Sequence, residues 1–153
     1  MTKVRELHDA LLRLAGFLSR PQADAALMRE AKVSIDRALF PLLVRIEREG
    51  PIGVVGLADL VGRDYTTVSR QVTKLEASGL VAKRSNEKDL RVTELAVTCK
   101  GRHVTDALDA ARERLVAPVL ARWPENDVAN LTRLLGKFVD DAELRIRQAD
   151  RRS

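Results

Sequence analysis

Two short helical segments separated by a glycine turn constrain the fold of this chain more than any other feature of its sequence. The first, residues 56–61, is mostly apolar and stops at Gly62. The second, residues 65–78, follows Asp64, a residue type that is favoured at helix N-caps. It ends before Gly79, which suits the left-handed position after a helix. The spacing therefore predicts two short helices joined by a tight turn.

A short hairpin is predicted directly after this helix pair. Residues 80–84 and 92–97 have the composition of strands, and the polar residues 85–91 form a turn between them. Two short helices followed by such a hairpin give the element order of a winged helix-turn-helix. Before the pair, the β-branched residues of 52–55 indicate a further brief strand.

Longer helices are predicted on both sides of this segment. Residues 3–18 and 22–32 show helical spacing of apolar side chains. Ser34 is expected to cap a helix that runs to about Glu49. Pro41 lies within that helix and either kinks it or shifts its start, and the sequence leaves both alternatives open. After the hairpin, the sequence predicts two more helices.

Thr98 is expected to cap a helix that runs to about Arg122, and Pro124 to begin the last helix. The predicted fold is therefore mainly α with a small β-hairpin wing, a single domain over residues 1–153. In this interpretation it consists of a winged helix-turn-helix core, residues 35–98, with helical dimerisation parts at 1–34 and 99–153.

The outer face of residues 65–78 is the predicted recognition surface for double-stranded DNA. Burial of Val68, Val72 and Leu75 turns the polar side chains outward. Short hydroxyls approach phosphates and base edges closely, and an arginine can bind guanine through two hydrogen bonds. The helix N-terminus is expected to offer free N–H groups to a phosphate. An ordinary solvated helix face is the alternative. The candidate residues are Tyr65, Thr66, Thr67, Ser69, Arg70, Thr73 and Lys74.

Basic side chains cluster in the hairpin that follows. A positive loop beside a recognition helix suits contact with phosphates and the minor groove. A polar tip that only maintains solubility is the alternative interpretation. The candidate wing residues are Lys83, Arg84, Lys88, Asp89 and Arg91.

Several motifs occur together in this part of the chain. They are Leu57-Ala58, the stretch Thr67 to Arg70, the stretch Leu75 to Val81, Asp89 with Arg91, and Thr98 with Gly101. In this order and spacing the chain resembles the MarR family of winged helix-turn-helix transcriptional regulators, over roughly residues 3–148. The resemblance implies that Ser69 and Arg70 lie in the major groove, and that Arg91, steadied by Asp89, lies near the minor groove. Val55 departs from the family pattern, which usually has a small or hydroxylated cap there.

The first and last helices have more apolar surface than the core can cover, which predicts a homodimer. The candidate dimerisation residues are Leu7, Leu11, Leu14, Leu131, Leu135 and Phe138. Two recognition helices related by a two-fold axis match a palindromic operator. The resemblance also implies a repressor and, since many members bind one, a small aromatic or phenolic ligand. The sequence itself leaves open both the ligand and the choice between repression and activation.

Composition narrows the classes of function. A net charge of +5 permits a polyanionic partner, and the aromatic content of 3% argues against a stacking platform for single strands. The single cysteine, Cys99, is expected to be a buried, inert thiol in a reducing cytoplasm, with a redox role as the alternative. The N-terminus is amphipathic and does not resemble a signal peptide, and no apolar stretch is long enough to predict a membrane span.

No enzyme, cofactor or metal is predicted, because the sequence has no Gly-rich phosphate loop and no nucleophile motif. Cys99 and His103 share a helix face, but two ligands are too few for zinc. Three interpretations remain: a ligand-responsive repressor, a constitutive DNA-binding protein, and a protein–protein interaction module. Arg70, Arg91 and the basic wing argue against the last.

Overall fold

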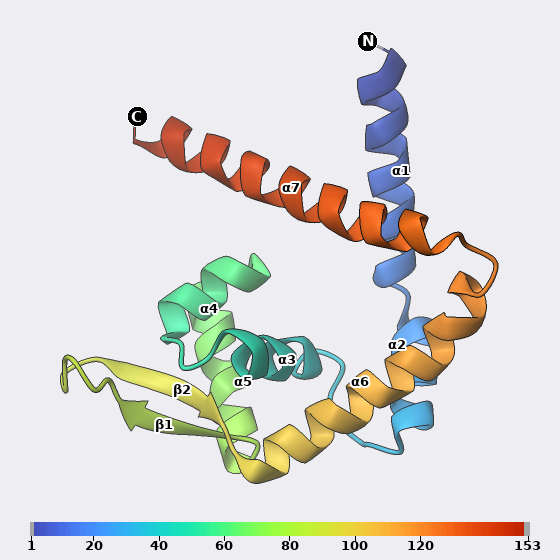
Figure 1. Cartoon of the computed structure of the whole chain (residues 1–153). Helices are drawn as coiled ribbons and strands as arrows, with labels where there is room; N and C mark the ends of the chain where they lie inside the picture. The colour runs from blue at the N-terminus through green and yellow to red at the C-terminus, as the bar shows by residue number, and fades with distance from the viewer. Residues whose placement is uncertain (1, 152–153) are drawn as a thin grey trace. The chain divides into compact units, whose positions relative to one another are not determined.

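A computed structural model describes residues 2–151 as a mainly helical chain with one two-stranded hairpin (Figure 1). This confirms the predicted fold class. The elements are α1 (Thr2–Leu18), α2 (Pro21–Ala31), α3 (Phe40–Glu49), α4 (Val54–Val61), α5 (Tyr65–Ala77), β1 (Val81–Ser85), β2 (Thr93–Val97), α6 (Cys99–Leu120) and α7 (Glu125–Asp150).

The chain divides into two compact units, one up to Arg112 and the other from Glu113 onwards. The first unit holds α1 to α5, the hairpin and the first part of α6. The second holds the end of α6 and all of α7. The predicted parts 1–34, 35–98 and 99–153 were divided by their expected roles in dimerisation and DNA binding, and that division stays a prediction.

The core of the first unit lies between α3, α4, α5 and the hairpin. Its fully buried side chains recur at helical spacing on α3 and α5, so each helix turns one apolar stripe inward. Each such side chain stabilises the fold by about 1.5–3 kcal/mol relative to exposure. They are Leu42, Leu43, Ile46, Leu57, Val68, Val72, Leu75 and Leu95. A smaller cluster of Leu27, Phe40, Leu108 and Ala111 connects α2, α3 and α6.

Helix α3 begins at Phe40, so the predicted cap at Ser34 is wrong. The residue at the N-cap is Leu39, and Pro41 lies in the first turn of the helix. Proline lacks a backbone N–H and is therefore tolerated only where that donor has no partner within the helix. Of the two alternatives for Pro41, the structure has the shifted start.

Helix α4 is longer at its start than predicted. It begins at Val54 after the N-cap Gly53, and Val55 lies exposed in its first turn. The brief strand expected at residues 52–55 is reduced to one bridge, in which Ile52 and Leu95 exchange backbone hydrogen bonds of 3.1 and 2.8 Å. Ile52 thus adds a single residue of pairing to the hairpin.

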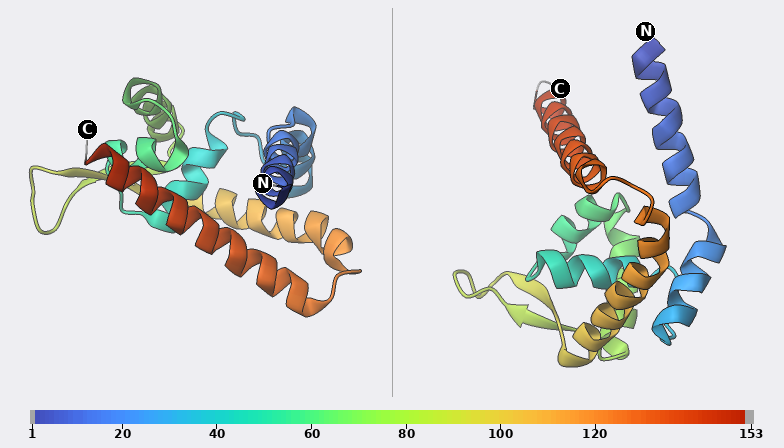
Figure 2. Two further views of the ribbon diagram at one scale, coloured as in Figure 1. Left: turned by 90° about the horizontal axis from the view of Figure 1, so that it is seen from above. Right: turned by 45° about the vertical axis from the view of Figure 1, so that its right-hand side comes forward.

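The hairpin extends away from α3, α4 and α5, as both views in Figure 2 show. Strand β1 pairs with β2 in antiparallel register, from Val81 opposite Val97 to Ser85 opposite Thr93. The base of the hairpin is buried through Val81 and Leu95. The rest of β1 is exposed, so the wing is anchored at one end only.

Helix α6 is fastened to the end of α5 and the start of β1. As predicted, Thr98 caps α6: its hydroxyl oxygen accepts from the N–H of Gly101 at 3.0 Å. The same hydroxyl donates to the carbonyl of Gly79 at 2.6 Å. A Cβ at Gly101 would lie 2.1 Å from the backbone oxygen of Leu80, so only glycine permits this close approach.

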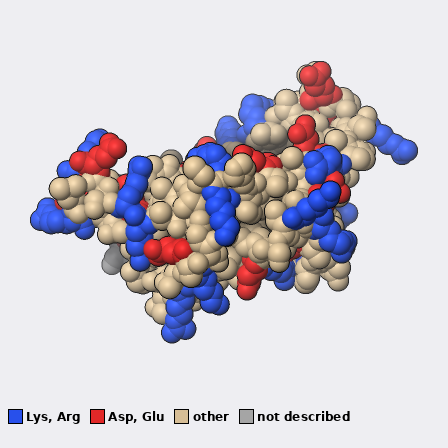
Figure 3. Space-filling view, turned by 90° about the horizontal axis from the view of Figure 1, so that it is seen from below, with Lys and Arg blue, Asp and Glu red and all other residues tan. Residues whose placement is uncertain are grey.

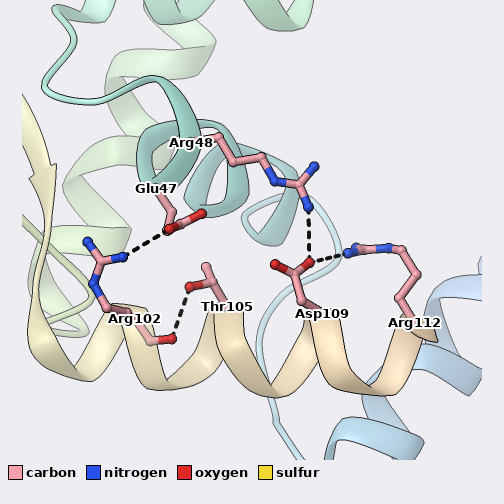
Figure 4. A network of polar contacts seen from close by, with 6 residues as sticks. All are labelled: Glu47, Arg48, Arg102, Thr105, Asp109 and Arg112. Carbon is pink, nitrogen blue, oxygen red and sulfur yellow. Dashed lines mark hydrogen bonds and ion pairs between the residues drawn. The ribbon is translucent and has the colours of Figure 1, made fainter. Parts of the chain in front are cut away.

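Ion pairs connect α6 to α3 farther along (Figure 4). Arg102 binds Glu47 at 3.0 Å, and Arg48 binds Asp109 at 3.0 Å. Asp109 also binds Arg112, one turn along α6. Because these side chains are mostly at the surface, each pair contributes about 0–1 kcal/mol, and the buried apolar contacts dominate the packing.

Helices α1 and α7 differ from the rest, because none of their described residues is buried. Both are amphipathic and keep large apolar side chains in water, including Phe17 on α1 and Phe138 on α7. Neither these helices nor any other within residues 2–151 is long and apolar enough to cross a membrane.

Candidate nucleic-acid interface

The turn between α4 and α5 is fixed by one glycine and one arginine. Gly62 has a φ of +64°, a conformation that favours glycine, and ends α4. Arg63 follows it, and its guanidinium donates to the backbone oxygen of Ala38 at 2.9 Å and to the side chain of Gln71 at 3.1 Å. The angle between the two short helices is therefore held both by the buried core and by this half-buried arginine.

Asp64 occupies the N-terminus of α5. One carboxylate oxygen accepts from the N–H of Thr67 at 2.9 Å, and the other accepts from the hydroxyl of Thr67 at 2.6 Å. These bonds, the hydroxyl first, lower the pKa of Asp64. The predicted cap is confirmed. The expectation of free N–H groups for a phosphate is wrong for Thr67, whose amide already binds Asp64.

The outer face of α5 is polar and open to solvent, as expected from the burial of Val68, Val72 and Leu75. Arg70 is exposed in the middle of the helix, and its guanidinium meets no carboxylate within residues 2–151. The exposed residues of the candidate set are Tyr65, Thr66, Arg70, Thr73 and Lys74, while Thr67 and Ser69 are half-buried.

The hydroxyls on this face are not equally available. Thr67 donates its hydroxyl to Asp64, and Thr73 donates to the carbonyl of Ser69 at 3.1 Å. A hydroxyl oxygen still accepts hydrogen bonds after it donates one. These two side chains are thus held in fixed orientations before any ligand arrives.

The wing residues differ in how free their charges are. Lys83 binds Glu76 at 3.2 Å, which joins β1 to the end of α5 and partly neutralises this lysine. Arg91 binds Asp89 at 3.1 Å, although the arginine side chain is 92% exposed. The hydrogen bonds from Arg91 lower the pKa of Asp89. Arg84 and Lys88 are exposed on the same hairpin.

The charge of the wing is mixed and not uniformly positive. In Figure 3 the hairpin lies at the left, and acidic side chains accompany the basic ones there. Glu87 and Asp89 account for the acidic residues of the turn. A surface with both signs of charge can select the position of a bound polyanion as well as attract it, because like-charge repulsion excludes some arrangements.

Two residues of this region escaped the sequence analysis. Asn86 organises the wing tip (residues 86–92), since its side-chain oxygen accepts from the N–H groups of Lys88 and Asp89 at 2.7 and 2.9 Å. The signal for it was an asparagine at the start of a polar turn, a common Asx-turn position. Arg63, by contrast, binds residues 25 and 8 positions away, which no local pattern reveals.

Two other predictions fall outside this interface. Cys99 is exposed and not buried. The reason is that α6 buries the stripe formed by Gly101, Thr105, Leu108 and Ala111, and Cys99 lies off that stripe. The dimerisation candidates lie on α1 and α7, away in sequence from residues 35–98, the winged segment, and all remain at least partly exposed.

Two short helices with a shared buried core, a polar exposed face on the second of them and a hairpin beside it together define a winged helix-turn-helix protein. Known protein families and structures show the same class of protein. The MarR family model matches residues 35–93. The resemblance to the MarR family is thereby confirmed, and residues 35–93 form a domain of that family.

Curated relatives from Bacillus subtilis (strain 168) are similar over most of their length. The HTH-type transcriptional regulator YybA is 26% identical over 133 residues, which cover 87% of this chain and 89% of that protein. The HTH-type transcriptional repressor MdtR is 23% identical, with 90% and 88% covered. These relatives are regulators of transcription and not enzymes, in agreement with the prediction from the sequence.

Solved structures show the same fold. A MarR family protein from Bacillus stearothermophilus has a TM-score of 0.75 at 23% identity, covering 93% of this chain and 96% of the other. FabT of Streptococcus pneumoniae, solved in complex with DNA, has a TM-score of 0.63 at 17% identity, covering 87% and 97%. At these identities the likeness concerns the fold.

Proposed function

We propose that this chain is a sequence-specific transcriptional regulator that binds duplex DNA. The observation that carries the proposal is the outer face of α5, with oriented hydroxyls and an Arg70 that has no ion-pair partner within residues 2–151, beside a projecting hairpin that carries exposed basic side chains. A helix of this kind enters the major groove, and the arginine reaches base edges there. The wing then lies at the adjacent phosphates and minor groove. The structure of FabT with DNA supports this use of the fold.

We further propose that the chain acts as a homodimer on a palindromic operator. The support is the row of exposed apolar side chains on α1 and α7, which a second copy would cover. Half-sites about 34–36 Å apart follow from two recognition helices on one face of the duplex. A repressor role is supported by the name of the relative MdtR. A DNA-binding regulator of this family acts in the cytoplasm.

Release by a small aromatic or phenolic ligand stays a prediction from the resemblance, and constitutive binding is its alternative. The two differ in one simple measurement, because only the first gives an operator affinity that falls when phenolic acids are added. The third interpretation, a protein–protein module, is disfavoured by the exposed Arg70 and Arg91.

The test is selection of bound sequences from a random duplex pool, followed by titration of the selected operator over a salt series. Within residues 2–151, four basic side chains per protomer, besides the base-reading Arg70, lie on α5 and the wing without a partner on another element: Lys74, Arg84, Lys88 and Arg91. With one phosphate for each, the eight contacts per dimer give a slope of log affinity against log salt of about −7. Arg84→Ala should make the slope less steep, and Arg147→Ala on α7 is the matched control. A flat salt response, or no enriched sequence, would contradict the proposal.

A further inference from the structure

The wing tip, residues 86–92, holds an apolar side chain that the fold does not use. Leu90 is 79% exposed, more than any other large hydrophobic side chain among the described residues. A side chain left in water contributes no hydrophobic stabilisation. Single exposed apolar residues are common on protein surfaces, so exposure alone assigns no role to Leu90. The hydrogen bonds and charges around Leu90 indicate one.

The backbone around this side chain is ordered by hydrogen bonds. The side-chain oxygen of Asn86 accepts from the N–H groups of Lys88 and Asp89. The N–H of Asn86 donates to the oxygen of Val92 at 2.8 Å, and the N–H of Val92 donates to the oxygen of Asp89 at 3.0 Å. Asn86 also donates to Glu94 at 2.5 Å. The tip is therefore pre-organised, which reduces the conformational entropy cost of binding.

The neighbours of Leu90 carry charge. Arg91 follows it and is held by Asp89, with Nε 3.1 Å from the carboxylate. Lys88 lies two residues before it and is exposed. Along the chain Leu90 lies between the cations Lys88 and Arg91, and the carboxylate of Asp89, directly before it, is bound to Arg91. An apolar side chain flanked by cations in this way fits a surface that has anionic edges and a less polar wall. The minor groove of DNA has this character, since phosphates border it, and proteins that enter it frequently insert apolar side chains there.

We propose that Leu90 packs against the deoxyribose wall of the minor groove while Arg91 meets the neighbouring phosphates. This inference rests on the proposed function and adds a residue that fixes the depth and position of the wing. An apolar contact to sugar makes no hydrogen bond to a base, so Leu90 contributes affinity that depends little on sequence. It also releases no counterion, so its contribution is independent of salt.

The salt series separates this contact from an electrostatic one. Leu90→Ser should weaken operator binding by about 10- to 100-fold at every salt concentration, the effect of removing one half-buried leucine from each of two protomers. The slope of log affinity against log salt should stay unchanged. Leu90→Met, which keeps the apolar volume, should bind within about twofold of the wild type. Arg91→Ala should instead reduce the slope by about 0.9 for each phosphate that the arginine neutralises in the wild type.

The outcomes distinguish this inference from the proposed function. If the wild-type protein selects no duplex, the proposed function itself is wrong. If the wild type binds and Leu90→Ser binds equally well, only the role of Leu90 is overturned. It is also overturned if Leu90→Ser leaves duplex binding intact but abolishes binding to phosphatidylglycerol vesicles. Thermal unfolding of the free Leu90→Ser protein should match that of the wild type, because the side chain is exposed.

Discussion

The winged segment and the two terminal helices use amphipathic helices in opposite ways. In the winged segment, α3 and α5 bury their apolar stripes in a common core, and Leu42, Val68 and Leu75 are fully buried. In α1 and α7 the stripes are present, yet none of the described residues is buried. The same sequence pattern therefore leads to a core in one region and to an uncovered surface in the other. The difference indicates that folding stability resides in the winged segment, and it supports the proposal that the terminal helices carry the dimer interface.

The largest expected effect tests the first half of this comparison. Leu42→Ala removes a fully buried side chain from the core and should lower the free energy of unfolding by about 2–5 kcal/mol. The decrease should be the same at all protein concentrations, because it does not involve a second copy. Chemical denaturation at two concentrations measures it. The matched variant is Leu134→Ala on α7, whose side chain is 53% exposed. An equal, concentration-independent decrease for Leu134→Ala would break the comparison.

A charge on α7 tests the second half. Phe138→Glu should weaken the dimer by at least about 100-fold, since an unpaired carboxylate would be buried in each half of an apolar interface. Sedimentation equilibrium should then show a folded species of 17.0 kDa at concentrations where the wild type is dimeric. Lys137→Glu, one residue away on the polar side of α7, is the control and should remain dimeric. A wild type that is monomeric at micromolar concentration would refute the dimer.

Surface substitutions in the winged segment should alter DNA binding and leave assembly unchanged. Arg70→Ala should cost about 1–3 kcal/mol per half-site and flatten the preference at one operator position, because the alanine cannot reach the base edge. Arg91→Ala should weaken operator and scrambled duplexes more evenly, since the minor groove offers a degenerate pattern.

Paired titrations on operator and scrambled DNA, with a thermal melt as control, measure both variants. If Arg91→Ala relaxes the sequence preference while Arg70→Ala leaves affinity and preference intact, the assignment of α5 as the recognition helix is wrong. Neither variant should change the melting temperature, because both side chains are exposed.

Features set by local chemistry were predictable from the sequence, and features set by distant contacts were not. Asp64 caps α5, Gly79 follows it at a φ of +71°, and Thr98 caps α6, all as expected, because capping depends on residues close in sequence. Ser34 failed as a cap because the residues after it form turns before Pro41 permits a helix to start.

The candidate site was predicted as a set of exposed residues but not in its internal contacts. The exposure of Arg70 follows from the burial of Val68 and Val72 on the opposite face. That Lys83 is bound to Glu76 was not foreseen, because the pair joins a strand to the preceding helix. The exposure of Cys99 likewise depends on which stripe of α6 meets the core, and several were compatible with its apolar residues.

The smallest predicted effect concerns the N-terminus of α5, where the winged segment relies on a polar contact at its surface. Hydrogen bonds from Thr67 lower the pKa of Asp64 below its ordinary value of 3.8. A carboxyl whose pKa is lower in the folded state contributes stability above its unfolded pKa, and this contribution disappears as the pH falls through the folded pKa.

Asp64→Ala should therefore lower the melting temperature near neutral pH, by less than Leu42→Ala does. The difference in melting temperature between wild type and Asp64→Ala should shrink as the pH falls below 3.8 and through the folded pKa of Asp64. Asp64→Asn, which keeps the capping oxygen, should melt close to the wild type at neutral pH and lack this pH dependence. A difference between wild type and Asp64→Ala that is constant down to strongly acidic pH would show that the carboxylate charge plays no part in holding the start of the recognition helix.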